Sequence, residues 1–84
     1  MQTTEPITAT AIETTREALV LVLGQRKVRI PWEKCSERLA SATEQERLRA
    51  ELSPGGYGIH WPLIDEDLSV NGLLREGNQR DKRS

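Results

Sequence analysis

The chain has 84 residues, which is enough for one small domain whose hydrophobic core only narrowly outweighs the conformational entropy of folding. Its 12 Lys and Arg residues nearly balance its 13 Asp and Glu residues, so no global field draws the protein to nucleic acid or anionic lipid. The single cysteine excludes an internal disulfide, and no apolar run approaches the roughly 20 residues that span a bilayer. We therefore expect a cytoplasmic protein without a membrane segment.

The first half of the chain predicts an antiparallel meander after a flexible arm. Residues 1–8 are polar, are interrupted by a proline and lack the basic and apolar parts of a signal peptide. Three strand patterns follow the arm, over residues 9–15, 18–23 and 27–31. Gly24 and Gln25 separate the second and third patterns, which is a hairpin signal. In the third strand Val28 and Ile30 are expected to face inward, while the two cations between and before them face outward.

The middle of the chain predicts two helices. Trp32 is expected to cover one end of the meander, and residues 33–42 then place Cys35, Leu39 and Ala42 on a narrow helical stripe. This position favours an inert, packed cysteine over a nucleophile.

Thr43 to Glu46 match a capping box, which marks the start of the second helix. We expect Leu48 and Leu52 on the inner face of this helix. Its charged residues are expected outside: Glu44, Glu46, Arg47, Arg49 and Glu51. Pro54 and the two glycines after it are expected to end the helix and to turn the chain.

A short fourth strand is predicted over residues 57–61, with Tyr57, Ile59 and Trp61 all facing the core. Gly58 is a weak strand residue, so its position suggests the close approach of another backbone or a bulge. Pro62 then stops the strand.

An acidic turn and a closing helix are predicted next. Asp65, Glu66 and Asp67 form the turn, and Asp67 or Ser69 is expected to cap the helix that follows. Its buried face would consist of Val70, Leu73 and Leu74. Residues 9–77 are thus predicted to form a single domain, followed by a disordered polar tail over residues 78–84.

Residues 57–62, followed by residues 65–74, resemble the C-terminal signature of a small bacterial family known as a domain of unknown function (number twenty-four forty-two). Further matches lie upstream: Ile30-Pro31-Trp32, Arg38-Leu39, Ala42-Thr43 and Glu51-Leu52. The resemblance implies an α+β fold, in which a small, strongly bent antiparallel sheet of about four strands packs with two or three short helices. It also implies a gene beside a short companion gene, as in toxin–antitoxin pairs, but it supplies no catalytic residues.

Five residues form the candidate functional surface: His60, Trp61, Asp65, Glu66 and Asp67. A histidine beside carboxylates could serve as a general base or metal ligand, and an exposed tryptophan could stack on bases or sugars. For each residue a structural role competes with these readings: packing for His60 and Trp61, and helix capping for the carboxylates. We therefore assign no catalytic, cofactor-binding or metal-binding residue.

Three functions remain in order of preference. The first is a non-enzymatic interaction or regulatory module that binds a small partner protein, in the manner of an antitoxin. The second is a nucleic-acid-associated accessory factor that uses the Lys27 and Arg29 face with the basic tail. The third is a small metal-binding protein or hydrolase centred on His60. The sequence predicts no enzyme and no cofactor, and it leaves the oligomeric state open.

Overall fold

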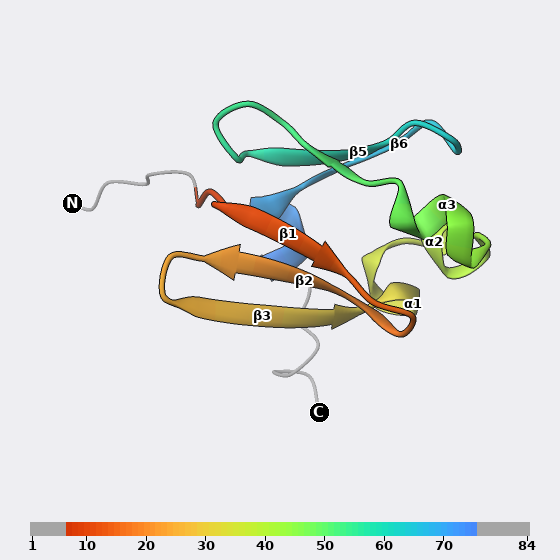
Figure 1. The fold of residues 1–84 in the computed structure, drawn as a ribbon, viewed down its shortest axis with the longest axis horizontal. Helices are drawn as coiled ribbons and strands as arrows, with labels where there is room; N and C mark the ends of the chain where they lie inside the picture. Colours follow the sequence, from red (N-terminus) through yellow and green to blue (C-terminus); the bar gives the residue numbers. More distant parts are fainter. Residues whose placement is uncertain (1–6, 76–84) are drawn as a thin grey trace.

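The apolar second strand and its neighbours form the first sheet, as predicted (Figure 1). A computed structural model describes residues 7–75, and the elements named below all lie in this range. The strands of this sheet are β1 (Ala11–Thr14), β2 (Ala18–Leu23) and β3 (Arg26–Pro31), in the order β1-β2-β3. Leu19 and Leu21 of β2 stand opposite Ile30 and Val28 of β3, so one face of the sheet is apolar and turns toward the core.

Three short helices follow the meander: α1 (Trp32–Cys35), α2 (Glu37–Ala40) and α3 (Glu44–Leu48). The prediction of one helix over residues 33–42 was wrong. Ser36 adopts extended backbone angles (φ −171°, ψ 162°), and its hydroxyl accepts a hydrogen bond from the backbone N–H of Leu39. A serine in this position starts a new helix, because its side chain satisfies an N–H group that has no partner inside the helix.

The capping box at α3 is confirmed, with Thr43 and Glu46 bonded reciprocally. The expected length and inner face of this helix were wrong. Leu48 is 47% exposed, and Leu52 lies outside the helix in β4 (Glu51–Leu52). Residues 51–52 are extended because they pair with the next strand, and this tertiary pairing outweighs the helix preference of Glu and Leu.

The second sheet consists of β4, β5 (Gly58–Trp61) and β6 (Glu66–Ser69), in the order β4-β5-β6. The α+β class is thus confirmed, but two three-stranded sheets replace the single sheet of about four strands that we expected. Glu66 and Asp67, predicted in a turn, are strand residues. Acidic residues are uncommon in strands, so pairing with β5, rather than local preference, places them there.

The predictions for β5 are confirmed except for the burial of Tyr57. Ile59 and Trp61 are buried as predicted, whereas Tyr57 is 54% exposed, because the bend at residues 56–57 takes it out of the alternation of the strand. The expected close approach at Gly58 is confirmed: a Cβ atom there would lie 3.3 Å from the backbone oxygen of Leu68.

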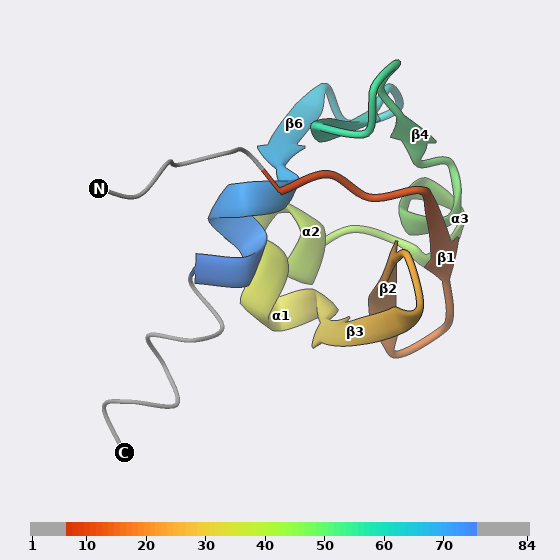
Figure 2. The ribbon, with the colours of Figure 1, turned by 90° about the vertical axis from the view of Figure 1, so that its left-hand side faces the viewer.

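Residues 70–75 are helical and follow β6 directly. Of the two caps that we considered, Ser69 is the one used: its hydroxyl accepts a hydrogen bond from the backbone N–H of Gly72 at 2.9 Å. Val70 and Leu73 are buried, and Figure 2 shows this helical segment beside α1 and α2. Residues 76 and 77 of the predicted domain, the tail over residues 78–84 and the first six residues of the arm lie outside the described residues.

The core is shared by both sheets and the helices. Its largest members with under 2% exposure come from every layer: Trp32, Trp61, Leu19, Leu21, Leu39, Ile59 and Val70. Ala9 ties the beginning of the described chain to the loop before β5, since its N–H donates to the carbonyl of Gly56 at 2.8 Å. Gly56 has a φ of 78°, and a Cβ atom there would lie 2.1 Å from the oxygen of Ala9, so both its conformation and its surroundings require glycine.

Candidate functional site

The β5–β6 hairpin distributes the five candidate residues over two faces. His60 stands opposite Asp67, and Trp61 stands opposite Glu66, in adjacent cross-strand pairs. Because successive side chains of a strand point to opposite faces, the His60–Asp67 pair and the Trp61–Glu66 pair lie on different sides of the sheet. Asp65 belongs to the turn, where it adopts a positive φ of 53°. The sequence therefore identified neighbours along the chain that the fold does not gather into one cluster.

His60 and Asp67 form a direct contact on the outer face of the second sheet. The Nδ1 atom of His60 lies 2.8 Å from a carboxylate oxygen of Asp67. The two side chains are 39% and 74% exposed, so water surrounds the pair. Within the described residues, no group of three or more His, Cys, Asp or Glu side chains is placed to hold a metal ion. The arrangement is a cross-strand polar pair, which fixes the register of the hairpin.

Trp61 is a core residue and offers no face to a ligand. It has no exposed surface, and its ring meets that of Trp32 edge to face, with centroids 6.3 Å apart and planes at 81°. Its indole Nε1–H donates to the backbone carbonyl of Arg47 at 3.2 Å. Both the apolar ring and its one donor are thus satisfied inside the protein.

Glu66 and the hairpin turn are held by α2. The Nη1 of Arg38 donates to the carbonyl of Ile64 at 3.1 Å, and its Nε lies 3.9 Å from the carboxylate of Glu66. The side chain of Glu66 is only 19% exposed. Sequence reasoning missed Arg38 as a partner of this hairpin, because the two lie in segments that only the tertiary fold brings together.

Cys35 lies at the end of α1, half-buried against the core as predicted. Burial raises the pKa of its thiol to about 12, although the positive charge of Arg47 acts in the opposite direction. Because the nucleophilic form of cysteine is the thiolate, the raised pKa keeps this thiol in its protonated, weakly nucleophilic form at neutral pH.

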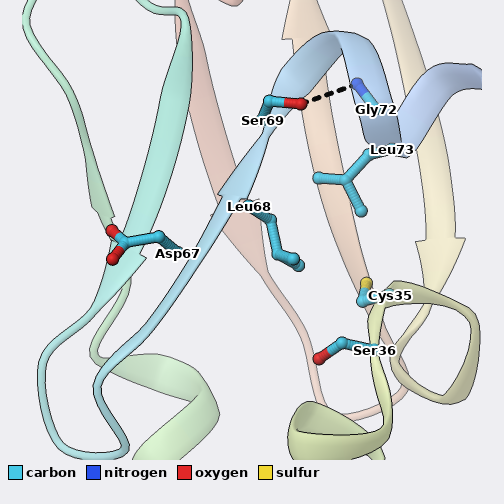
Figure 3. Close-up of a pocket in the computed structure, with 7 residues that line it drawn as sticks. All are labelled: Cys35, Ser36, Asp67, Leu68, Ser69, Gly72 and Leu73. Atoms are coloured by element: carbon cyan, nitrogen blue, oxygen red, sulfur yellow. Dashed lines mark hydrogen bonds between the residues drawn. The ribbon is translucent and has the colours of Figure 1, made fainter.

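A groove borders the outer edge of β6 and was not predicted. It has a volume of about 380 Å³ and lies between β6 and the junction of α1 with α2 (Figure 3). Leu68 and Leu73 form its apolar part, and Cys35 and Ser36 face them from the helical junction. The side chain of Asp67 points away from this groove. No local sequence pattern predicts such a groove, because its walls come from two segments that are far apart in the sequence.

The predicted basic face on the first sheet is neutralised by neighbouring carboxylates. Lys27 contacts Glu13 at 3.2 Å and Arg29 contacts Glu17 at 3.4 Å, with all four side chains at least half exposed. Such pairs reduce the local positive potential that nucleic-acid binding would need.

Comparisons with known proteins place this fold in a family. The structure is similar to a crystal structure of a protein of unknown function from Rhodospirillum rubrum ATCC 11170, with a TM-score of 0.74 and 27% sequence identity. The likeness covers 86% of this chain and 88% of that one. No curated protein matches the sequence. No helix of the described residues is long and apolar enough to cross a membrane.

A family model described as "Protein of unknown function (DUF2442)" matches residues 8–79, which is most of the chain. This match includes every segment that carried the resemblance in the sequence, from Ile30-Pro31-Trp32 to residues 65–74. The chain belongs to the DUF2442 family.

Proposed function

We propose that this chain is a non-enzymatic interaction module that binds one small partner protein, with the antitoxin-like member of a toxin–antitoxin-type gene pair as its biological setting. The observation that supports this function is the edge of the second sheet. Within residues 7–75, β6 pairs with β5 on one side, and its other side opens on the groove beside α1 and α2. An open sheet edge next to a groove is a recurring means of binding an extended protein segment.

The candidate residues support surface recognition better than a reaction. Trp61 and the neutral thiol of Cys35 belong to the packing of the molecule, whereas His60 and Asp67 are exposed on the sheet face next to the open edge. An exposed polar pair at an edge can select a partner by charge without taking part in chemistry.

The test is affinity capture of the tagged full-length chain, expressed together with its native gene neighbours and treated with nuclease. We expect one small protein at stoichiometric yield, identified by mass spectrometry. Recovery of the chain alone from a host that carries the intact operon would contradict the proposed function.

The same experiment separates this function from the nucleic-acid alternative. A double variant, Lys27→Gln with Arg29→Gln, removes two exposed cations from the first sheet, away from β6. Under the proposal this variant captures the partner as well as the wild type does. Capture of nucleic acid that is lost in this variant and falls steeply with salt would instead establish an accessory factor.

A further inference from the structure

The hydrogen-bond pattern of β5 and β6 shows which backbone groups of β6 are turned outward. The N–H of Val70 donates to the carbonyl of Tyr57 at 2.9 Å, which makes these two residues a hydrogen-bonded pair. In antiparallel strands such pairs alternate with pairs that exchange no hydrogen bonds. By this alternation Leu68 bonds to β5, whereas Asp67 directs its backbone N–H and C=O, and Ser69 its backbone N–H, away from β5 and toward the open edge. The C=O of Ser69 belongs to the first turn of the helix that Ser69 caps.

The groove provides space on one side of this edge. Leu68 and Leu73 line it with apolar surface, and Cys35 and Ser36 close the opposite wall (Figure 3). Its volume of about 380 Å³ lies within the range of roughly 300–1,000 Å³ that is typical of ligand-binding pockets. An added strand would place the residue opposite Leu68 on the core side of the sheet, where this groove accepts it.

The other side of the edge carries negative charge. The carboxylate of Asp67 is 74% exposed and points away from the groove. The residue directly opposite Asp67 in an added strand would lie on the same face, where a cation forms a favourable cross-strand pair.

The outer edge of β3 carries features that protect it against further pairing, and β6 lacks these features. Lys27 and Arg29 lie in β3, and the strand ends at Pro31, which has no N–H to donate. Cationic side chains and proline are features that protect sheet edges against further pairing. β6 carries neither a cation nor a proline.

We propose that the β6 edge binds an extended segment of the partner protein by strand addition, with an apolar side chain in the groove opposite Leu68 and Lys or Arg opposite Asp67. This inference rests on the proposed function and adds to it the position and the chemistry of the contact. The backbone of Asp67 and Ser69 supplies the hydrogen bonds. Successive side chains of the bound segment lie on opposite faces of the sheet, so they contact the groove and the carboxylate of Asp67 in turn.

The experiment uses the purified full-length chain, labelled with ¹⁵N, and a blocked synthetic peptide of sequence Thr-Lys-Val-Lys-Thr. We expect saturable shifts of the amide signals of Asp67 and Ser69, because these donors gain acceptors. A first control peptide has a methyl group on the backbone nitrogen of each lysine, so it lacks the N–H donors that face the edge. A second control peptide has glutamate in place of both lysines, so a like charge lies opposite Asp67. Each change is expected to weaken binding at least about tenfold.

A matched pair of variants tests the edge itself. Asp67→Ala and Asp67→Pro both remove the carboxylate and its contact with His60, but only the proline also removes the outward N–H donor. We expect Asp67→Pro to bind the peptide at least about tenfold more weakly than Asp67→Ala. If Asp67→Pro loses the wild-type amide spectrum elsewhere in the chain, the methylated peptide alone decides the question.

Four results would overturn the inference: equal binding by the two folded variants, equal binding of the methylated peptide, shifts centred on Lys27 and Arg29, or self-association of the chain that Asp67→Pro abolishes. The last would make a second copy the occupant. Because the peptide experiment needs no natural partner, it can fail while the affinity capture succeeds. In that case the interaction module stands and only its binding edge is wrong.

Discussion

At the scale of single residues, Arg47 connects more parts of the molecule than any pattern in its helix suggested. Its Nε and Nη2 each donate at 2.9 Å, to the carbonyls of Leu39 and Ala40 at the end of α2. Its guanidinium carbon lies 5.5 Å from the centroid of the Trp32 ring, a cation–π distance. We had expected Arg47 on the outer, solvated face of α3. It is half-buried because the exposed carbonyls at a helix end attract a cationic donor.

Trp61→Ala is expected to be among the most destabilising substitutions. It removes a fully buried ring that meets Trp32 and bonds to Arg47, and the loss of a buried aromatic typically costs about 3–5 kcal/mol. Urea unfolding measures the difference in the free energy of unfolding. Leu63→Ala is the matched control in the same hairpin, since Leu63 is 56% exposed and should change stability by no more than about 0.5 kcal/mol. Similar effects of the two substitutions would contradict the burial of Trp61.

The raised pKa of the Cys35 thiol can be tested at alkaline pH. Burial raises its pKa from 9.0 to about 12, so the folded thiol stays protonated where an unfolded thiol has begun to ionise. Above pH 9 the unfolded chain gains stability by ionising its thiol, whereas the folded chain does not. The free energy of unfolding therefore keeps its full value below pH 9 and decreases as the pH rises from 9 toward 12. At pH 8 we expect a disulfide reagent to react with the folded chain at least about a hundredfold more slowly than with the chain in denaturant. Comparable rates would show that the thiol is accessible and ionised.

At the scale of elements, the Thr43 cap is the local signal on which α3 depends. The helix has five residues, so few internal hydrogen bonds hold it, and its first turn relies on the reciprocal bonds between Thr43 and Glu46. Thr43→Ala should lower the free energy of unfolding by about 1 kcal/mol. Thr43→Ser keeps the hydroxyl and should restore most of that loss in the same denaturation assay. Equal stability of the alanine and serine variants would mean that the cap contributes nothing.

The elements that sequence reasoning found are those with local signals. The alternation of β3, the two-residue turn at Gly24 and Gln25, and the capping box all follow from residues close together in the chain. β4 and β6 escaped prediction because they are short and acidic, and only β5 makes them strands. The break at Ser36 escaped because the apolar stripe of residues 33–42 fits a single helix equally well.

The candidate site was predictable only in part for the same reason. His60 and Asp67 were both named, and the structure brings them into contact. Trp61 was named as a surface candidate although its competing role in the core is the correct one. The groove beside β6 joins residues 35–36 to residues 67–73, and such a juxtaposition depends on the packing of the second sheet against the helices.

At the scale of the whole molecule, the two sheets share one core. Leu19 and Leu21 from the first sheet, Ile59 and Trp61 from the second, and Leu39 from α2 belong to the same buried cluster. Neither sheet can bury its apolar face without the other, so we expect both to unfold in one cooperative step.

Tryptophan fluorescence and far-ultraviolet circular dichroism test this expectation. Trp32 follows the first sheet directly, and Trp61 lies in the second. In the variant Trp61→Phe the fluorescence of Trp32 reports on the first sheet, and in the variant Trp32→Phe the fluorescence of Trp61 reports on the second. Within each variant, the fluorescence and circular dichroism transitions in urea should coincide. Midpoints that differ between the probes within one variant would reveal two separately stable sheets.

The shared core also determines when the chain can fold during its synthesis. The three strands of the first sheet leave the ribosome first, but Trp61 and Leu73, which bury its inner face, are among the last core residues to be made. Since protein synthesis adds about 5–20 residues per second, the apolar face of the first sheet stays exposed for on the order of several seconds before Trp61 and Leu73 are made. The bond from Ala9 to Gly56 forms in the same late step. The apolar face of the first sheet therefore stays without its full cover until almost all of the described residues have been made.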